Sequence, residues 1–138
     1  MSNNMLLVFL IGIVAVGIML IVVIALTRRS PKGLDREKYQ TDWLAIENRL
    51  ATDQASQQMA IIDADKLLDR ALKERGFRGQ TMGERMTSAG RIFSKREAMW
   101  AAHKLRNKIA HEEVKLNIKL TRQALGFFKQ ALKDIGAL

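Results

Sequence analysis

The residues best suited to chemistry lie in one short segment, which reads Leu-Arg-Asn-Lys-Ile-Ala-His-Glu over residues 105–112. At a phosphate, Arg106 would hold the scissile group and stabilise the negative charge of the transition state. His111 would act as base and acid, because imidazole groups titrate near neutral pH. Asn107, four residues before His111, would orient the ring. These roles need no metal ion.

Helical geometry separates Arg106 from His111. Each residue of a helix advances by about 100°, so the two side chains point about 140° apart. Joint action therefore requires the length of the arginine side chain, unwinding near His111, or a second chain. The expected core-facing stripe is Ala98, Ala102, Leu105 and Ile109, and the opposite side carries Arg96, Trp100, His103, Asn107 and His111.

A structural role for the same residues stays open, because Arg106, Asn107 and His111 could simply tie one helix end to its neighbours. His103 matches no catalytic position, and we expect a surface histidine without a function. The two histidines lie about 12 Å apart along an ideal helix, too far for one zinc ion. The glycines form no phosphate-binding loop. We therefore predict no metal and no other cofactor.

An arginine, any four residues and a histidine, with an amide directly after the arginine, resembles the signature of the HEPN superfamily of small helical domains, many of which cut RNA. The resemblance covers about residues 53–136, and Ala102 to Glu112 also looks like the motif helix of membrane-tethered bacterial relatives in that superfamily. It implies a homodimer whose motif helices form one composite site, with the Trp100 face as the candidate dimer surface. It also implies RNA or a nucleotide as ligand, although some members are inactive domains retained for assembly.

A long apolar segment lies near the N-terminus. Met5 to Leu26 has no charged side chain and is about 33 Å long as a helix, enough for a bilayer core of about 30 Å. We interpret it as a transmembrane helix in the lipid bilayer. A cleaved signal peptide is the main alternative, but the stretch is long, Met1 to Asn4 carry no basic side chain and no clear cleavage site follows. A buried soluble helix would need a larger partner core than the remaining residues can build.

Charge indicates the orientation and the kind of partner. Arg28, Arg29 and Lys32 follow the apolar segment, and flanking positive charge tends to stay in the cytoplasm. We therefore expect a single-pass protein of the inner (cytoplasmic) membrane with a cytoplasmic C-terminal domain. Residues 76–138 hold thirteen Lys and Arg against five Asp and Glu, an excess that attracts the phosphates of nucleic acid or of anionic lipid. The absence of cysteine excludes disulfides and cysteine nucleophiles.

Glycine, proline and capping residues predict where the helices begin and end. Residues 34–75 contain neither glycine nor proline, which predicts one long helix or two abutting helices. Gly76 followed by Phe77 is typical of a helix C-cap. Thr81 with Glu84, and Ser94 with Glu97, match the capping box at a helix start. Asn117 would cap a last helix after an extended start, with an expected core face of Thr121, Ala124, Leu125, Phe128, Ala131, Leu132 and Ile135.

The predicted fold class is all-α, with an N-terminal transmembrane helix followed by a HEPN-like four-helix bundle. The expected segments are a short tail at 1–4, the transmembrane helix at 5–27, a basic linker at 28–34, a juxtamembrane helical stalk at 35–52 and the bundle at 53–138.

The predicted function is RNA or nucleotide binding, or metal-independent ribonuclease activity, through Arg106, Asn107 and His111. The alternative is a non-catalytic, membrane-tethered dimerisation scaffold. In that alternative the stalk around Trp43 and the Trp100 face recruit another protein, and the basic half lies against anionic lipid.

Overall fold

The described part of the chain is entirely helical. A computed structural model describes residues 3–27 and 33–138, and these ranges contain six helices and no strand, which confirms the all-α class for them. Arg28, Arg29 and Lys32 of the predicted linker lie outside the described residues. The helices are α1 (Asn3–Thr27), α2 (Arg36–Arg49), α3 (Gln54–Glu74), α4 (Met82–Ser88), α5 (Arg96–His111) and α6 (Ile118–Asp134).

Helix α1 forms one of the two compact units of the chain. Its span from Asn4 to Leu26 is long and apolar enough to cross a membrane. The second unit contains α2 to α6 and builds its own core.

Local capping chemistry sets several helix ends, as the sequence predicts. The Thr81 hydroxyl accepts a hydrogen bond from the Glu84 amide at 3.2 Å at the start of α4. The Asn117 carboxamide oxygen accepts from the Leu120 amide at 2.8 Å at the start of α6. After α3, Gly76 takes a φ of 85°, a conformation that glycine adopts without steric cost.

The predicted capping box of Ser94 and Glu97 is wrong. Helix α5 begins after Lys95, and no side chain caps it. Ser94 instead uses both its amide and its hydroxyl to donate to the Asp134 carboxylate, each at 2.8 Å. This carboxylate at the end of α6 competes successfully for the serine, so Ser94 ties the α4–α5 loop to α6.

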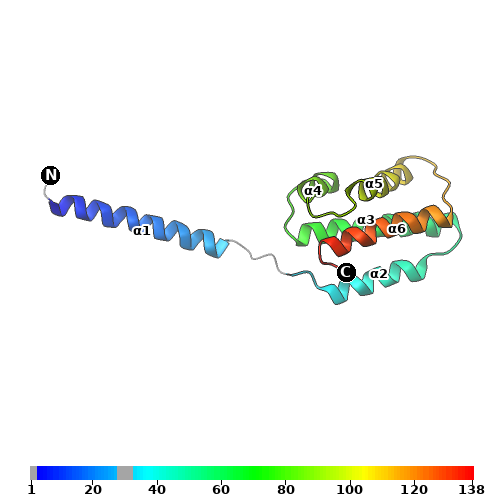
Figure 1. Cartoon of the computed structure of the whole chain (residues 1–138), viewed down its shortest axis with the longest axis horizontal. Helices are drawn as coiled ribbons and strands as arrows, with labels where there is room; N and C mark the ends of the chain where they lie inside the picture. Colours follow the sequence, from blue (N-terminus) through cyan, green and yellow to red (C-terminus); the bar gives the residue numbers. More distant parts are fainter. Residues whose placement is uncertain (1–2, 28–32) are drawn as a thin grey trace. The chain divides into compact units, whose positions relative to one another are not determined.

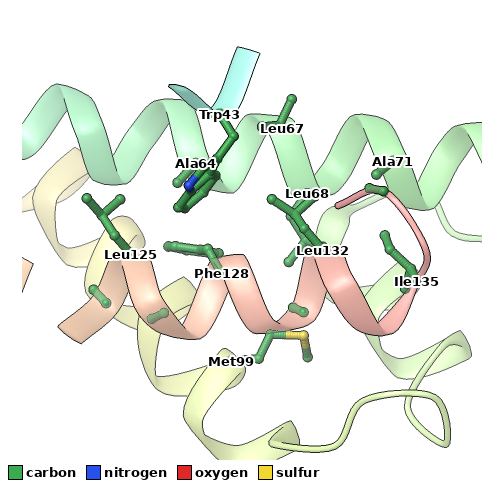
Figure 2. Close-up of a cluster of buried hydrophobic side chains, with 14 of the residues drawn as sticks. Trp43, Ala64, Leu67, Leu68, Ala71, Met99, Leu125, Phe128, Leu132 and Ile135 are labelled. Carbon is green, nitrogen blue, oxygen red and sulfur yellow. The ribbon is translucent and has the colours of Figure 1, made fainter. Parts of the chain in front are cut away.

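Helix α3 is the centre of the second unit, because it packs against each of the other four helices. Figure 1 shows α3 and α6 side by side, with α2 on one side of the pair and α4 and α5 on the other. In Figure 2, Phe128 and Leu132 of α6 pack toward Ala64 and Leu68 of α3. Every position of the predicted α6 core face is buried, which confirms that face.

The interpretation of residues 35–52 as a stalk is corrected by the packing of α2. Tyr39, Trp43 and Ile46 of this helix are buried in the same core as α3 and α6. Leu50 ends α2 and Asp53 caps α3, so the region forms two abutting helices. The second unit is therefore a five-helix bundle: α3 to α6 occupy the range predicted for four helices, and α2 adds a fifth.

A buried tyrosine couples α2 to α3. Tyr39 is 1% exposed, and the Arg70 guanidinium lies 4.7 Å from the centroid of its ring. Arg70 Nε donates to the Tyr39 hydroxyl at 3.4 Å, and Arg70 also pairs with Asp42 of α2. Burial is the largest influence on this phenol, and it raises the pKa of Tyr39 to about 12.

The raised pKa predicts a loss of stability at alkaline pH. The folded state favours the neutral phenol, so the contribution of Tyr39 is complete below its ordinary value of 10.0 and is lost as the pH rises through about 12. We expect the free energy of unfolding to fall across this window, and to fall less in Tyr39→Phe. Because Tyr39 is the only tyrosine, tyrosinate absorbance follows it directly. Equal alkaline losses in both proteins would contradict this expectation.

Candidate functional site

The face that α5 turns to the core only partly overlaps the face that its sequence predicts: Ala102 is buried, and the partly buried Leu105 and Ile109 pack against the core. Its buried residues are Met99, Ala102 and His103, while Ala98 and Leu105 of the predicted stripe are only half-buried. The expectation that His103 is a surface residue is therefore wrong. The helix packs against both α3 and α6, and the three buried residues lie on one helical face together with Arg106.

The Asp65 carboxylate of α3 joins two side chains of this face. Asp65 is 4% exposed, and its Oδ1 lies 2.7 Å from His103 Nδ1. Its Oδ2 lies 3.3 Å from Arg106 Nε. A buried carboxylate is costly unless it is paired and hydrogen-bonded, and α5 supplies both requirements from adjacent turns of one helix.

Asn107 closes this network and orients the imidazole. Arg106 Nη1 donates to Asn107 Oδ1 at 3.1 Å, and Asn107 Nδ2 lies 3.3 Å from His103 Nε2. Arginine can only donate, so the amide oxygen faces Arg106 and the amide NH2 group faces His103. His103 Nε2 is then the acceptor, and the proton of the neutral ring is on Nδ1, where it is donated to Asp65.

The network lines one wall of a pocket with a volume of about 430 Å³ between α3, α4 and α5. Trp100 packs beside it, with its ring centroid 5.9 Å from that of His103 at an interplanar angle of 77°. The lining residues are Asp65, Lys66, Asp69, Thr81, Met82, Gly83, His103, Arg106 and Asn107.

A second ion pair fixes the position of α4 at the pocket. The buried Arg85 donates from Nε to Asp69 Oδ1 at 2.7 Å and from Nη1 to the Gly79 carbonyl at 2.6 Å. Burial alone would raise the pKa of Asp69, but the hydrogen bonds from Lys73 and Arg85 outweigh it and lower the pKa below its ordinary value. Asp69 is therefore a carboxylate at neutral pH, and Arg85 is occupied by its ion pair with Asp69.

Arg106 retains unused capacity to donate. Its side chain is 29% exposed at the pocket, yet its Nε is buried and, at 3.3 Å from Asp65, has no hydrogen bond of good geometry. Among the described residues, Trp43 Nε1 is the other buried side-chain nitrogen or oxygen atom without a hydrogen bond. An unmade hydrogen bond at a buried donor costs about 1–3 kcal/mol, so charge and not a well-formed hydrogen bond holds Nε beside Asp65.

The predicted site residues do not all meet. Arg106 and Asn107 line the pocket, whereas His111 is exposed at the last residue of α5 and is not part of the lining. The expectation that Asn107 orients His111 is wrong within one chain, because Asn107 contacts His103.

Sequence reasoning missed Asp65 and His103. The sequence does indicate that Asp65 lies at a core position, because this residue continues the helical spacing of Ile61, Leu68 and Leu72 on α3. A carboxylate at a core position requires a cationic or donor partner, and His103 and Arg106 share one face of α5.

Comparison with known proteins finds no match to this chain among protein-family models, curated proteins or solved structures. The assignment of this site therefore follows from its own residues and geometry.

The network predicts that Asp65 contributes strongly to stability. Asp65→Ala leaves Arg106 and His103 without their buried partner, and we expect it to lower the free energy of unfolding by about 3–5 kcal/mol. The matched control is Asp63→Ala, which removes a surface pair with Arg49 and should cost less than about 1 kcal/mol. Urea unfolding of the full chain in detergent, followed by circular dichroism, measures both. Similar costs for the two variants would contradict a central role for Asp65.

Proposed function

We propose that this protein is a membrane-anchored helical domain that binds RNA or a nucleotide through phosphate, in the pocket between α3, α4 and α5. The observation that carries the proposal is the convergence of Arg106 and Asn107 on one wall of that pocket, where the Arg106 side chain is 29% exposed. A planar guanidinium matches the geometry of a phosphate, and a neighbouring amide adds a further donor.

The size and charge of the pocket support this ligand class. A volume of about 430 Å³ is in the range of small-molecule sites and fits one nucleotide unit of a chain. Asp65 and Asp69 are paired with cations of the same chain, and Lys66 is exposed at the pocket. The excess of basic residues in the range 76–138 would attract a polyanion to this part of the molecule.

The membrane location is part of the proposal. Helix α1 has the length and composition of a membrane span, and Arg28, Arg29 and Lys32 follow it in the sequence. The positive-inside rule then favours a single-pass protein with the bundle in the cytoplasm, where RNA is present. The Arg-x4-His pattern supports a HEPN-like relationship and a homodimer.

Metal-independent ribonuclease activity is the second candidate function. The observation in its favour is the exposure of His111 at the last residue of α5. A second chain could therefore place its own pocket against this imidazole, as the resemblance to the superfamily implies. A composite site of that kind would join Arg106 and Asn107 of one chain with His111 of the other.

Binding of a short RNA to the full chain in detergent micelles with EDTA tests the main proposal. Arg106→Lys keeps the charge beside Asp65 but loses the planar fork, so we expect binding to weaken by about 10-fold or more. The matched control is Arg122→Lys on the exposed face of α6, which should change binding less than about 3-fold. Fluorescence anisotropy measures both affinities, and a nucleoside monophosphate competitor separates nucleotide from RNA recognition.

Two results would contradict this function. Equal losses in both variants would show that RNA binds only to the general basic surface. No binding of RNA or nucleotide by the folded wild-type protein would favour the non-catalytic scaffold, in which Arg106 serves only to secure α5 against Asp65.

A further inference from the structure

His103 stands in an arrangement suited to proton transfer. Its Nδ1 is held by the Asp65 carboxylate at 2.7 Å, and its Nε2 is an acceptor at the pocket. A carboxylate on one ring nitrogen fixes the tautomer and stabilises the imidazolium that forms when the other nitrogen takes a proton. No role in the predicted motif requires either residue.

We propose that His103 is the catalytic base of this pocket, that Asp65 is its positioning residue, and that the substrate is RNA. The proposal rests on the phosphate-binding function of Arg106 and Asn107 and names the chemistry at the same site. A base beside a phosphate-binding arginine can remove the proton of a hydroxyl on the bound molecule, and the oxygen of that hydroxyl is then the nucleophile. RNA carries such a hydroxyl next to each phosphodiester, and DNA does not.

The step balances with no further reactant. His103 Nε2 takes the proton of the 2′-hydroxyl as the 2′-oxygen forms a bond to the adjacent phosphorus. The bond from phosphorus to the 5′-oxygen breaks, and the imidazolium returns its proton to that oxygen. The products are a 2′,3′-cyclic phosphate and a 5′-hydroxyl. Arg106 stabilises the additional negative charge on the phosphate oxygens.

The geometry favours His103 over His111 within one chain. His103, Arg106 and Asn107 line the same pocket, and they are spaced so that their side chains share one face of α5. The contact from Asn107 Nδ2 to His103 Nε2 is long at 3.3 Å, and a substrate hydroxyl can take its place. Trp100 and the buried surroundings of His103 keep water from much of the ring.

The experiment compares cleavage and binding by the full chain in detergent micelles with EDTA. The substrates are a short RNA and its 2′-O-methyl form, which has no attacking hydroxyl. His103→Gln keeps a donor for Asp65, and we expect it to lower kcat by about 10²–10⁴-fold. Its affinity for the 2′-O-methyl RNA should stay within a few-fold of the wild-type value.

Asp65→Asn tests the positioning role, and we expect kcat to fall while KM stays close to the wild-type value. Analysis of the wild-type products does not depend on whether any variant folds. We expect 2′,3′-cyclic phosphate ends and no cleavage of the 2′-O-methyl RNA. Ends with a 3′-hydroxyl and a 5′-phosphate would overturn the proposal.

Other outcomes separate this proposal from the function on which it rests. Full activity of His103→Gln, or loss of activity in His111→Ala alone, would overturn the role of His103 and leave phosphate binding intact. Binding without cleavage by the wild-type protein would do the same. Failure of the folded wild-type protein to bind either RNA would overturn the proposed function itself.

Discussion

Burial of the Asp65 carboxylate is the constraint on which the site depends. The residue lies on α3, which contacts every other helix of the bundle, and it occupies a position that the apolar pattern assigns to the core. An unpaired carboxylate there would be strongly unfavourable, so the helix packed against it must supply donors. Helix α5 does so with His103 and Arg106, and this requirement fixes which face of α5 points inward.

The same network links the stability of the bundle to the chemistry at its surface. Arg106 extends from Asp65 toward the pocket and also sets the orientation of Asn107, which in turn sets the acceptor nitrogen of His103. A substitution that removes the polar groups of any one of these side chains therefore alters packing and the pocket together. Measurements on such variants need a stability readout beside every functional one, because loss of binding alone does not distinguish the two effects.

The predictions that the structure confirms are those that depend only on short stretches of the chain. The α6 core face, the Gly76 cap and the start of α4 at Thr81 follow from spacing and local hydrogen bonds, and the structure has all three. The features that failed depend on partners distant in sequence: Ser94 binds a carboxylate at the end of α6 in place of capping α5, and α2 docks on α3. Local periodicity identifies an amphipathic helix but does not say which helix covers it.

The candidate site was predicted only in part, because it also depends on a partner that is distant in sequence. Arg106 and Asn107 lie in the pocket, but which histidine joins them depends on the rotation of α5, and Asp65 decides that rotation. The most direct test follows the ring resonances of the two histidines by nuclear magnetic resonance while 2′-O-methyl RNA is added to the full chain in micelles. A pocket built around Asp65 predicts that the His103 ring responds and saturates with binding. A response confined to His111 would contradict it.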